Sequence, residues 1–246
     1  MADTAPLVIV GTGLAGYNLA KEFRKLDNQR PMLLVSADDG RFYSKPLLST
    51  GFSKGKEADE LAMQDAAAMA AQIGAEVLTG VPVSAINPAE RTLTLGDREQ
   101  AYSDLVLALG AEVRALPWRE QLGERLLSIN DLADYGRFRA ALTGRKKVLI
   151  IGAGLIGCEF ANDLSLGGFE VTVVATDPWL MPQLLPEPVA AAGQRRLEAL
   201  GVTFHLGCGI RELAASDDAL LALLDDGSEV HADQGLSAIG LAPRTD

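Results

Sequence analysis

The sequence predicts an α/β protein built from two similar strand–turn–helix–strand units. Two segments with one pattern support this: LVIVGTGLAGYNLA at residues 7–20 and VLIIGAGLIGCEFA at residues 148–161. Each starts as a short apolar run, continues through Gly-x-Gly-x-x-Gly and ends in apolar residues at helical spacing. A second apolar strand follows each helix, at Met32–Val35 and Phe169–Val174. The two units are therefore expected to be Rossmann-like.

The spacing of the glycines is typical of a turn that holds a dinucleotide pyrophosphate. The first glycine allows the sharp turn, the second lets phosphate approach the backbone, and the third lets helix and strand pack closely. They are Gly11, Gly13 and Gly16 in the first motif and Gly152, Gly154 and Gly157 in the second. One copy alone could be an ordinary glycine-rich turn, but two copies in the same context favour two nucleotide sites. Two such sites in one chain favour hydride transfer between the nucleotides.

Composition excludes several other functions. The chain has 246 residues and a net charge of −11, which argues against nucleic acids and anionic membranes as partners. No apolar run is long enough to span a bilayer, and no basic region precedes the first apolar run as in a signal peptide. We therefore expect a cytoplasmic protein.

The cysteines and histidines give no sign of a metal site or a disulfide. Cys158 and Cys208 stand alone, without a CxxC pattern. Cys158 follows the second glycine motif, where a helix N-terminus could lower the thiol pKa, but a buried packing residue is the favoured interpretation. His205 and His231 have no visible partners in the sequence and are expected to be structural or exposed.

The first half of the chain is expected to form one domain, residues 1–112. After Met32–Val35 comes a long polar loop, ADDGRFYSKPLLSTGFSKGKEAD, and loops of this length are usually functional. A single helix is predicted over Ala58–Ile73. Short strands follow, with a hairpin around Gly96–Asp97. The strands are expected at Leu7–Val10, Met32–Val35, Ala75–Leu78, Pro82–Ile86, Arg91–Leu95, Arg98–Tyr102 and Leu105–Leu109, and the first helix at Leu14–Leu26.

The second domain is expected over residues 113–240, after a connector at Ala111–Asn130 that has few periodic residues. Asp131 is placed to cap a helix whose apolar positions are Leu132, Tyr135, Phe138 and Leu142. Residues 241–246 are expected to begin a return to the first domain. The further elements expected are strands at Lys146–Ile151, Phe169–Val174, Val202–His205, Ala219–Leu224, Glu229–His231 and Leu236–Ile239, and helices at Leu155–Leu166 and Val189–Leu200.

This order of elements and motifs resembles that of the flavin-dependent pyridine nucleotide–disulfide oxidoreductases, in which an NAD domain is inserted into an FAD domain. The segments that carry the resemblance are GTGLAGYNLAKEFRKLD, ADDGRFYSKPLLSTGFSK, AYSDLVLALGA, GAGLIGCEFANDLS and AIGLAPRT. Within that fold the chain looks closest to reductases of iron–sulfur proteins, which implies rubredoxin as the electron acceptor. The resemblance implies FAD and NADH as cofactors. From the charge, the cysteine pattern and the lengths of the apolar runs we expect no nucleic acid, no metal and no membrane, and we expect a monomer.

The resemblance assigns the FAD site to the first glycine motif and to matching positions after it. The motif contributes its glycines with Thr12, Leu14 and Ala15. Ser36 and Ala37 match the position at which the family often places an acid for the ribose; Asp38 or Asp39 could substitute for that acid, but we expect them to shape the turn instead. The other matching positions are Arg41, Val83, Ala108 and Gly110.

Lys45 and Glu159 are the catalytic candidates. In the reductases that this chain resembles, a lysine of the long loop lies beside the flavin N5 and pairs with a glutamate of the NAD helix. An ammonium group there favours the electron-rich reduced flavin. The alternative is that Lys45 is a solvated loop lysine and Glu159 an ordinary charge of the helix surface. A local basic patch of Arg41, Lys45 and Lys54 could dock an acidic partner, or these could be scattered solvated charges.

The second nucleotide is expected to be NADH. The second glycine motif supplies its glycines with Leu155 and Ile156, and Ala238 and Gly240 match the strand end where the chain leaves the NAD domain. NADPH sites usually offer an arginine to the 2′-phosphate, and no arginine occurs between Arg145 and Arg195. The acid expected for NADH is also missing, unless Asp177 serves.

The expected reaction is hydride transfer from NADH to the flavin N5, followed by single-electron transfer to rubredoxin. No cysteine precedes Cys158, so the redox cysteines of the disulfide reductases and peroxidases of this fold are absent. The alternatives are a ferredoxin reductase, another NADH:acceptor reductase, or a nucleotide-binding fragment without turnover. The last FAD segment and the interface domain are expected to be missing, because the chain ends soon after the last predicted strand. Weak or no FAD retention by this chain alone is expected in consequence.

Overall fold

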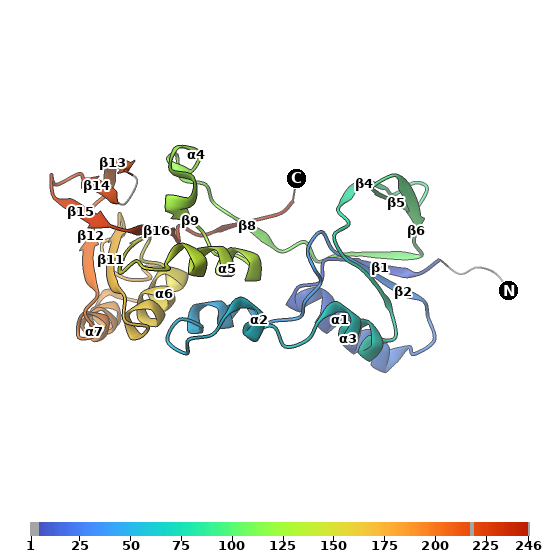
Figure 1. Ribbon diagram of the computed structural model, residues 1–246. Coiled ribbons are helices and arrows are strands. Elements are labelled where there is room, and N and C mark those ends of the chain that lie inside the picture. The colour runs from blue at the N-terminus through green and yellow to red at the C-terminus, as the bar shows by residue number, and fades with distance from the viewer. Residues whose placement is uncertain (1–4, 217–218, 246) are drawn as a thin grey trace. The chain divides into compact units, whose positions relative to one another are not determined.

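The computed structural model describes residues 5–216 and 219–245 (Figure 1). Within this part of the chain the contacts divide into two compact units. Unit 1 contains the described residues of Met1–Ser44, Ala62–Ala111 and Pro243–Asp246, and unit 2 contains Lys45–Leu61 and Glu112–Ala242. The segment Lys45–Leu61 thus belongs with the second unit, whereas the sequence placed it in the first domain.

Unit 1 is built on a parallel sheet in the order β3-β2-β1-β7. Its strands are short apolar runs in which all residues of β1 and β2 are buried, as expected when both faces of a parallel sheet are covered. The glycine motif joins β1 to helix α1. The strands are β1 (Leu7–Val10), β2 (Met32–Val35), β3 (Glu76–Leu78) and β7 (Asp104–Leu107), and the helices are α1 (Leu14–Leu26) and α3 (Ala66–Ile73).

The alternation of side chains along β1 divides the core of unit 1 into two layers. Leu7 and Ile9 pack with apolar residues of α1 and α3, whereas Val8 and Val10 pack with Leu93 and its neighbours. Leu93 lies in an antiparallel sheet of β4 (Val83–Asn87), β5 (Thr92–Leu95) and β6 (Arg98–Ala101). Helices therefore cover one face of the parallel sheet and a second sheet covers the other (Figure 1).

Unit 2 repeats this design on a larger parallel sheet in the order β12-β11-β10-β16-β9. Leu149 and Ile151 of β10 pack against the antiparallel sheet β13-β14-β15, while α6 and α7 lie along the opposite face (Figure 1). The strands of the parallel sheet are β9 (Leu126–Leu127), β10 (Lys147–Ile151), β11 (Glu170–Ala175), β12 (Thr203–Leu206) and β16 (Gln234–Ser237). The antiparallel sheet contains β13 (Ile210–Ala215), β14 (Leu220–Leu224) and β15 (Glu229–Ala232), and the helices are α5 (Leu132–Ala141), α6 (Leu155–Leu166) and α7 (Glu187–Glu198).

The helix predicted over Ala58–Ile73 is wrong, because the structure contains two helices there. Helix α2 (Ala58–Leu61) ends before Met63, whose backbone N–H donates to the Phe42 carbonyl at 2.8 Å. Helix α3 begins after Asp65, whose carboxylate accepts from the Ala68 N–H at 2.7 Å. Asp65 is the N-cap of α3, and its side chain is a partner for one of the unpaired N–H groups of the first turn. Because an N-cap residue lies outside the helix, this hydrogen bond stabilises α3 as a separate helix.

The connector predicted at Ala111–Asn130 and the long loop before Ala58 also contain elements that the sequence did not indicate. The connector includes β8 (Ala111–Val113), α4 (Arg119–Leu122), the 3₁₀ turn η2 (Gly123–Arg125) and β9, which extends the parallel sheet. The loop includes the 3₁₀ helix η1 (Lys45–Thr50). Strand β13 was not predicted at all. The last strand, β17 (Leu241–Pro243), pairs with β8.

Candidate dinucleotide sites

The two glycine turns have nearly the same backbone geometry. Gly11 has φ +110° and Gly152 has φ +113°, a region that favours glycine. A Cβ at Gly11 would clash with the Ala108 carbonyl oxygen, and one at Gly152 would lie 2.6 Å from the Ala238 carbonyl oxygen. The carbonyl groups of Ala108 and Ala238, which follow β7 and β16, thus lie against the two turns. A part for these two residues in cofactor binding stays a prediction.

The third glycine of each motif brings the helix onto the turn. A Cβ at Gly16 would meet the Gly11 carbonyl oxygen, and one at Gly157 would meet that of Gly152. Both glycines are buried. Any side chain at these positions would therefore force the helix away from its strand.

The second glycine leaves a space that protein atoms do not fill. A Cβ at Gly13 or Gly154 would have no described heavy atom within 4 Å. These glycines are the N-caps of α1 and α6, and among the described residues no side chain caps either helix. Each turn therefore points free backbone N–H donors and the positive end of a helix dipole into open space, which suits an anionic pyrophosphate.

The second turn opens into a cavity of about 1020 Å³ whose lining residues all belong to unit 2. This volume is at the upper end of the range typical of cofactor sites, about 300–1,000 Å³. The lining includes the predicted residues Gly152, Gly154, Leu155, Ile156, Ala238 and Gly240. The structure thus brings six of the predicted residues of the second site together, and Gly157 lies beneath them at the turn.

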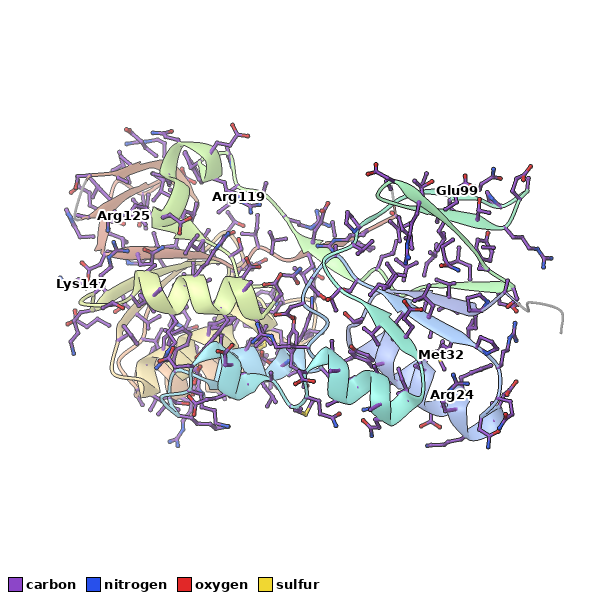
Figure 2. The ribbon with its side chains drawn as sticks, turned by 45° about the vertical axis from the view of Figure 1, so that its right-hand side comes forward. Arg24, Met32, Glu99, Arg119, Arg125 and Lys147 are labelled. Carbon is purple, nitrogen blue, oxygen red and sulfur yellow. The ribbon has the colours of Figure 1, made fainter. Side chains whose placement is uncertain are left out.

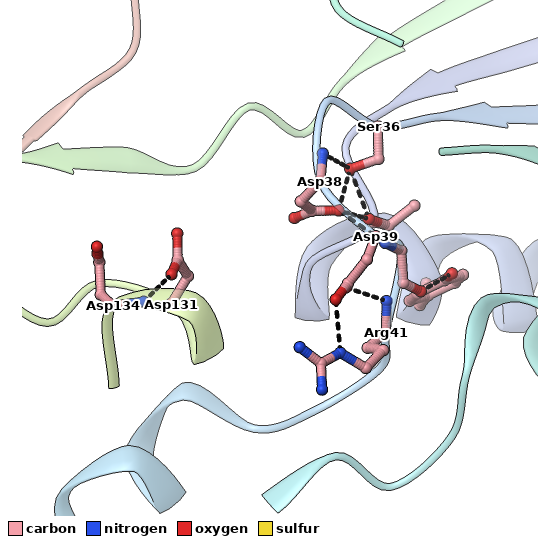
Figure 3. Close-up of polar contacts among 9 residues, drawn as sticks. Ser36, Asp38, Asp39, Arg41, Asp131 and Asp134 are labelled. Atoms are coloured by element: carbon pink, nitrogen blue, oxygen red, sulfur yellow. Dashed lines mark hydrogen bonds and ion pairs between the residues drawn. The ribbon is translucent and has the colours of Figure 1, made fainter. Parts of the chain in front are cut away.

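In unit 1 the strand end expected to hold a ribose contains a compact hydroxyl–carboxylate cluster. The hydroxyl of buried Thr12 donates to Ser36 Oγ at 2.8 Å, and Ser36 Oγ donates to Asp38 Oδ1 at 2.5 Å. Asp38 Oδ1 also accepts from the Gly40 N–H at 2.9 Å. Figure 3 shows Ser36 and Asp38 joined in this network. Asp38 therefore shapes the turn, in agreement with the favoured interpretation.

Asp39 has a similar local role. Its Oδ1 accepts from the Arg41 N–H at 3.1 Å, and its Oδ2 lies 2.7 Å from Arg41 Nε (Figure 3). The turn also buries the Tyr17 hydroxyl, which donates to the Gly40 carbonyl at 2.5 Å, and burial raises the pKa of Tyr17 to about 12. Of the remaining FAD candidates, Val83 begins β4 and is half-buried against the core between the two sheets of unit 1, and Ala37 and Gly110 are exposed.

Lys45 and Glu159 both lie in unit 2, where η1 contacts α6. Lys45, the first residue of η1, donates from Nζ to Asn130 Oδ1 at 2.9 Å. Glu159, half-buried on α6, accepts from Ser49 Oγ at 2.8 Å. The structure therefore brings the two elements together through Ser49, and direct pairing of Lys45 with Glu159 stays a prediction.

A buried carboxylate that the sequence analysis missed fixes the segment after η1. Asp163 is 1% exposed, and its oxygens accept from the Phe52 N–H at 2.9 Å, the Ser53 N–H at 2.9 Å and the Ser53 hydroxyl at 2.5 Å. Tyr135 supports the same segment by donating to the Lys56 carbonyl at 2.7 Å. The signal available in the sequence was the spacing of Glu159 and Asp163, four residues apart on one helix face.

The thiols and the remaining cavity residues complete the site. Cys158 is buried, which raises its pKa to about 11, so it is a packing residue as expected. Cys208 is half-buried and lines the cavity, together with Arg114, Trp118 and Asp225, none of which the sequence indicated.

Among the described residues no group of three or more histidine, cysteine or acidic residues could hold a metal, and no helix is long and apolar enough to cross a membrane.

Comparison with known proteins agrees with this geometry. The profile of the pyridine nucleotide-disulphide oxidoreductase family matches residues 5–246. The chain belongs to this family. The two glycine turns described above are the ones that the resemblance assigned to FAD and NADH.

Two curated relatives and one solved structure show how far the similarity extends. The chain is 51% identical over 240 residues to the rubredoxin-NAD(+) reductase of Alcanivorax borkumensis, covering 97% of this chain and 63% of the relative. It is 40% identical over 249 residues to the rubredoxin-NAD(+) reductase of Acinetobacter baylyi, covering 98% of this chain and 63% of the relative. A crystal structure of a covalent putidaredoxin reductase–putidaredoxin complex matches with a TM-score of 0.86 at 28% identity, covering 97% of this chain and 59% of that one.

The chain thus spans slightly less than two thirds of the length of these relatives. The fold class predicted from the sequence, two Rossmann-like units in a pyridine nucleotide–disulphide oxidoreductase, is confirmed by the family match and the sheet topology. The names of these reductases say what each of them reduces. The electron acceptor of this chain is a proposal, which the next subsection makes.

Proposed function

We propose that this chain carries the nucleotide-binding part of an FAD-dependent NADH:rubredoxin oxidoreductase. The observation that carries the proposal is the pair of matched glycine turns. Each has open space beside its second glycine, and no side chain of residues 5–216 or 219–245 caps the helix that follows. The 51% identity to a rubredoxin-NAD(+) reductase supports rubredoxin as the acceptor. We also propose that the protein is a monomer and that it works in the cytoplasm.

The residues of unit 1 fit the FAD pyrophosphate and ribose. Gly13 leaves space for phosphate, and the N–H groups at the start of α1 are its donors. The hydroxyl network of Thr12 and Ser36, held by Asp38, stands at the strand end where a ribose is expected. When bound, the flavin supplies the chemistry, because it accepts a hydride from NADH and passes electrons on singly.

The residues of unit 2 fit NADH in the cavity of about 1020 Å³. The turn at Gly152–Gly154 and the start of α6 are the donors for its pyrophosphate. Leu155, Ile156 and Trp118 add apolar side chains to the cavity lining. We assign Lys45 and Glu159 to electrostatic support of the reduced flavin, with Ser49 holding Glu159 in place.

The test is reduction of rubredoxin in a stopped-flow spectrometer. The chain is incubated with FAD and mixed with NADH and oxidised rubredoxin, and the loss of rubredoxin absorbance is followed. The proposal expects NADH-dependent reduction that requires FAD, with ferredoxin reduced at least tenfold more slowly. Faster reduction of ferredoxin would overturn the choice of acceptor, and NADH binding without reduction of either acceptor would assign the chain to nucleotide binding alone.

A further inference from the structure

The cavity of unit 2 lacks an acidic side chain at the position where this fold usually places one. In Rossmann sheets an Asp or Glu after the second strand binds the adenosine ribose of NAD. Here Ala175 ends β11 and Thr176 follows it. Asp177 comes next, and its backbone carbonyl accepts from the Gly207 N–H at 2.8 Å. The last residue of the strand and the one after it therefore offer no carboxylate to a ribose, although Asp177 lines the same cavity.

Asp225 supplies a carboxylate at that strand end from the turn after β14. Its Oδ2 accepts from the Gly209 N–H at 3.1 Å, and its own N–H donates to the Gly209 carbonyl at 3.0 Å. A Cβ at Gly209 would lie 2.5 Å from Asp225 Oδ2 and 3.6 Å from Thr176 Cγ2. Asp225 and Thr176 therefore flank the same small space, and both line the cavity.

The neighbouring aspartate has a different role. Asp226 Oδ1 accepts from the Ser228 N–H at 2.9 Å and from the Ser228 hydroxyl at 2.6 Å, so this carboxylate closes its own hairpin turn. These two hydrogen bonds lower the pKa of Asp226. Asp225 is fixed through Oδ2 alone, and within the described part of the chain its Oδ1 accepts no hydrogen bond. Of the two adjacent carboxylates, Asp225 is the one left to bind a ligand.

We propose that Asp225 binds the adenosine ribose hydroxyls of the dinucleotide and is the residue that selects NADH over NADPH. The inference rests on the proposed function, because it assumes a dinucleotide in this cavity. An ionised carboxylate accepts strong hydrogen bonds from ribose hydroxyls. The same carboxylate repels the 2′-phosphate of NADPH, as does that of Asp177, which also lines the cavity.

The position of the cavity's cation agrees with this assignment. Arg114 is the one Lys or Arg among the described residues that line the cavity, and its Cδ lies 3.9 Å from the place of a Cβ at Gly240, just past β16. In the sheet, β11 and β16 lie on opposite sides of β10. The guanidinium group therefore belongs to the other side of the cavity from Asp225 and is not placed to neutralise a 2′-phosphate.

Equilibrium binding to the full chain tests the assignment without any turnover. NADH and NADPH are each titrated into the protein and followed by nicotinamide fluorescence, with ADP-ribose as a displacing probe. Asp225→Asn is expected to weaken NADH binding about tenfold and to reduce the preference for NADH over NADPH by more than tenfold. Asp226→Asn is the matched control, and both its affinity for NADH and its preference should equal those of the wild type.

A second variant tests the geometry and not the charge. Gly209→Ala keeps the carboxylate but places a Cβ 2.5 Å from Asp225 Oδ2, so the carboxylate must move, and NADH binding is expected to weaken severalfold. Circular dichroism checks that each variant is folded. Unchanged NADH affinity and preference in Asp225→Asn would overturn the inference while leaving the proposed function intact. A wild-type chain that does not bind NADH would overturn both.

Discussion

Gly154 and Gly157 belong to one glycine motif, but a methyl group would meet different surroundings at each. At Gly157 it would collide with the Gly152 carbonyl oxygen, so Gly157→Ala must shift backbone and should cost about 3 kcal/mol of stability. At Gly154 it would point into open space, so Gly154→Ala should cost about 1 kcal/mol or less, as a change of N-cap residue. NADH affinity should nevertheless fall at least tenfold in Gly154→Ala, because the methyl group occupies the phosphate position.

Tryptophan fluorescence during urea unfolding measures the stabilities directly, because both tryptophans, Trp118 and Trp179, belong to unit 2. Nicotinamide fluorescence measures the affinities. Equal loss of stability in the two variants would contradict the distinct roles assigned to the second and third glycines.

Asp163 gives a second prediction at this scale. Asp163→Asn replaces a carboxylate that accepts three hydrogen bonds by an amide that can turn only one acceptor oxygen toward them. Because hydrogen bonds to charged groups are worth about 1.5–3 kcal/mol, the variant should lose about 3 kcal/mol. Ser53→Ala, which removes one of the three donors, is the matched control and should lose about 1 kcal/mol. Tryptophan fluorescence during urea unfolding measures both stabilities. A loss of stability in Asp163→Asn no larger than that in Ser53→Ala would contradict the role of Asp163 in fixing the segment after η1.

The cysteines give a pH-dependent prediction. Burial raises the pKa of Cys158 to about 11, so this thiol holds its proton at pH 8 and should resist alkylation, whereas half-buried Cys208 should react. The same pKa shift determines how the free energy of unfolding depends on pH. An unfolded thiol ionises near pH 9 but the folded one does not, so stability should fall as the pH rises from about 9 to about 11. Cys158→Ala should flatten this fall; mass spectrometry of alkylated peptides and urea unfolding at each pH measure the two effects.

At the scale of elements, Arg24 links two helices of unit 1. Its guanidinium group donates to the carbonyl oxygens of Ile73, Gly74, Asp27 and Arg30, over distances from 2.6 to 3.1 Å. Figure 2 shows Arg24 on the helical side of unit 1. The last turns of α1 and α3 are thus held by one side chain, which satisfies carbonyl groups that helix ends leave unpaired.

Replacement by lysine should weaken this link. Arg24→Lys keeps the charge but loses the planar set of donors, so we expect a loss of about 2 kcal/mol in unit 1. Hydrogen exchange of the peptides that contain α1 and α3 should show faster opening. Lys25→Ala, which changes an exposed neighbour on the same helix, is the control. Exchange in Arg24→Lys that matches the control would contradict the linking role.

Elements of strong local signal were predictable and those that depend on distant partners were not. The helices at Leu14–Leu26 and Leu155–Leu166 have the predicted bounds, because glycine motifs fix their starts. The Asp131 cap is also confirmed, since its carboxylate accepts from the Asp134 N–H at 2.7 Å (Figure 3). The break between α2 and α3 depends instead on a bridge of Gln64 to Phe42, which no local pattern reveals.

The same limit applies to the sites. The glycine turns follow from a motif with fixed spacing, and the strand ends at Ala108 and Ala238 follow from the family resemblance. The structure places each strand end against its turn. Asp225 reaches the cavity through a hairpin that starts far along the chain from the glycine motif, so its place depends on the tertiary pairing of β13, β14 and β15. The assignment of Lys45–Leu61 to unit 2 depends likewise on the buried contacts of Asp163 and Tyr135.

At the scale of the whole molecule, the central proposal is that each of the two parallel sheets carries one dinucleotide turn. The most direct test is a crystal structure of the chain with FAD and NADH. We expect the FAD pyrophosphate at the start of α1 beside Gly13 and the NADH pyrophosphate at the start of α6 beside Gly154. Either nucleotide bound away from these turns, or a turn left empty at saturating concentration, would contradict the proposal.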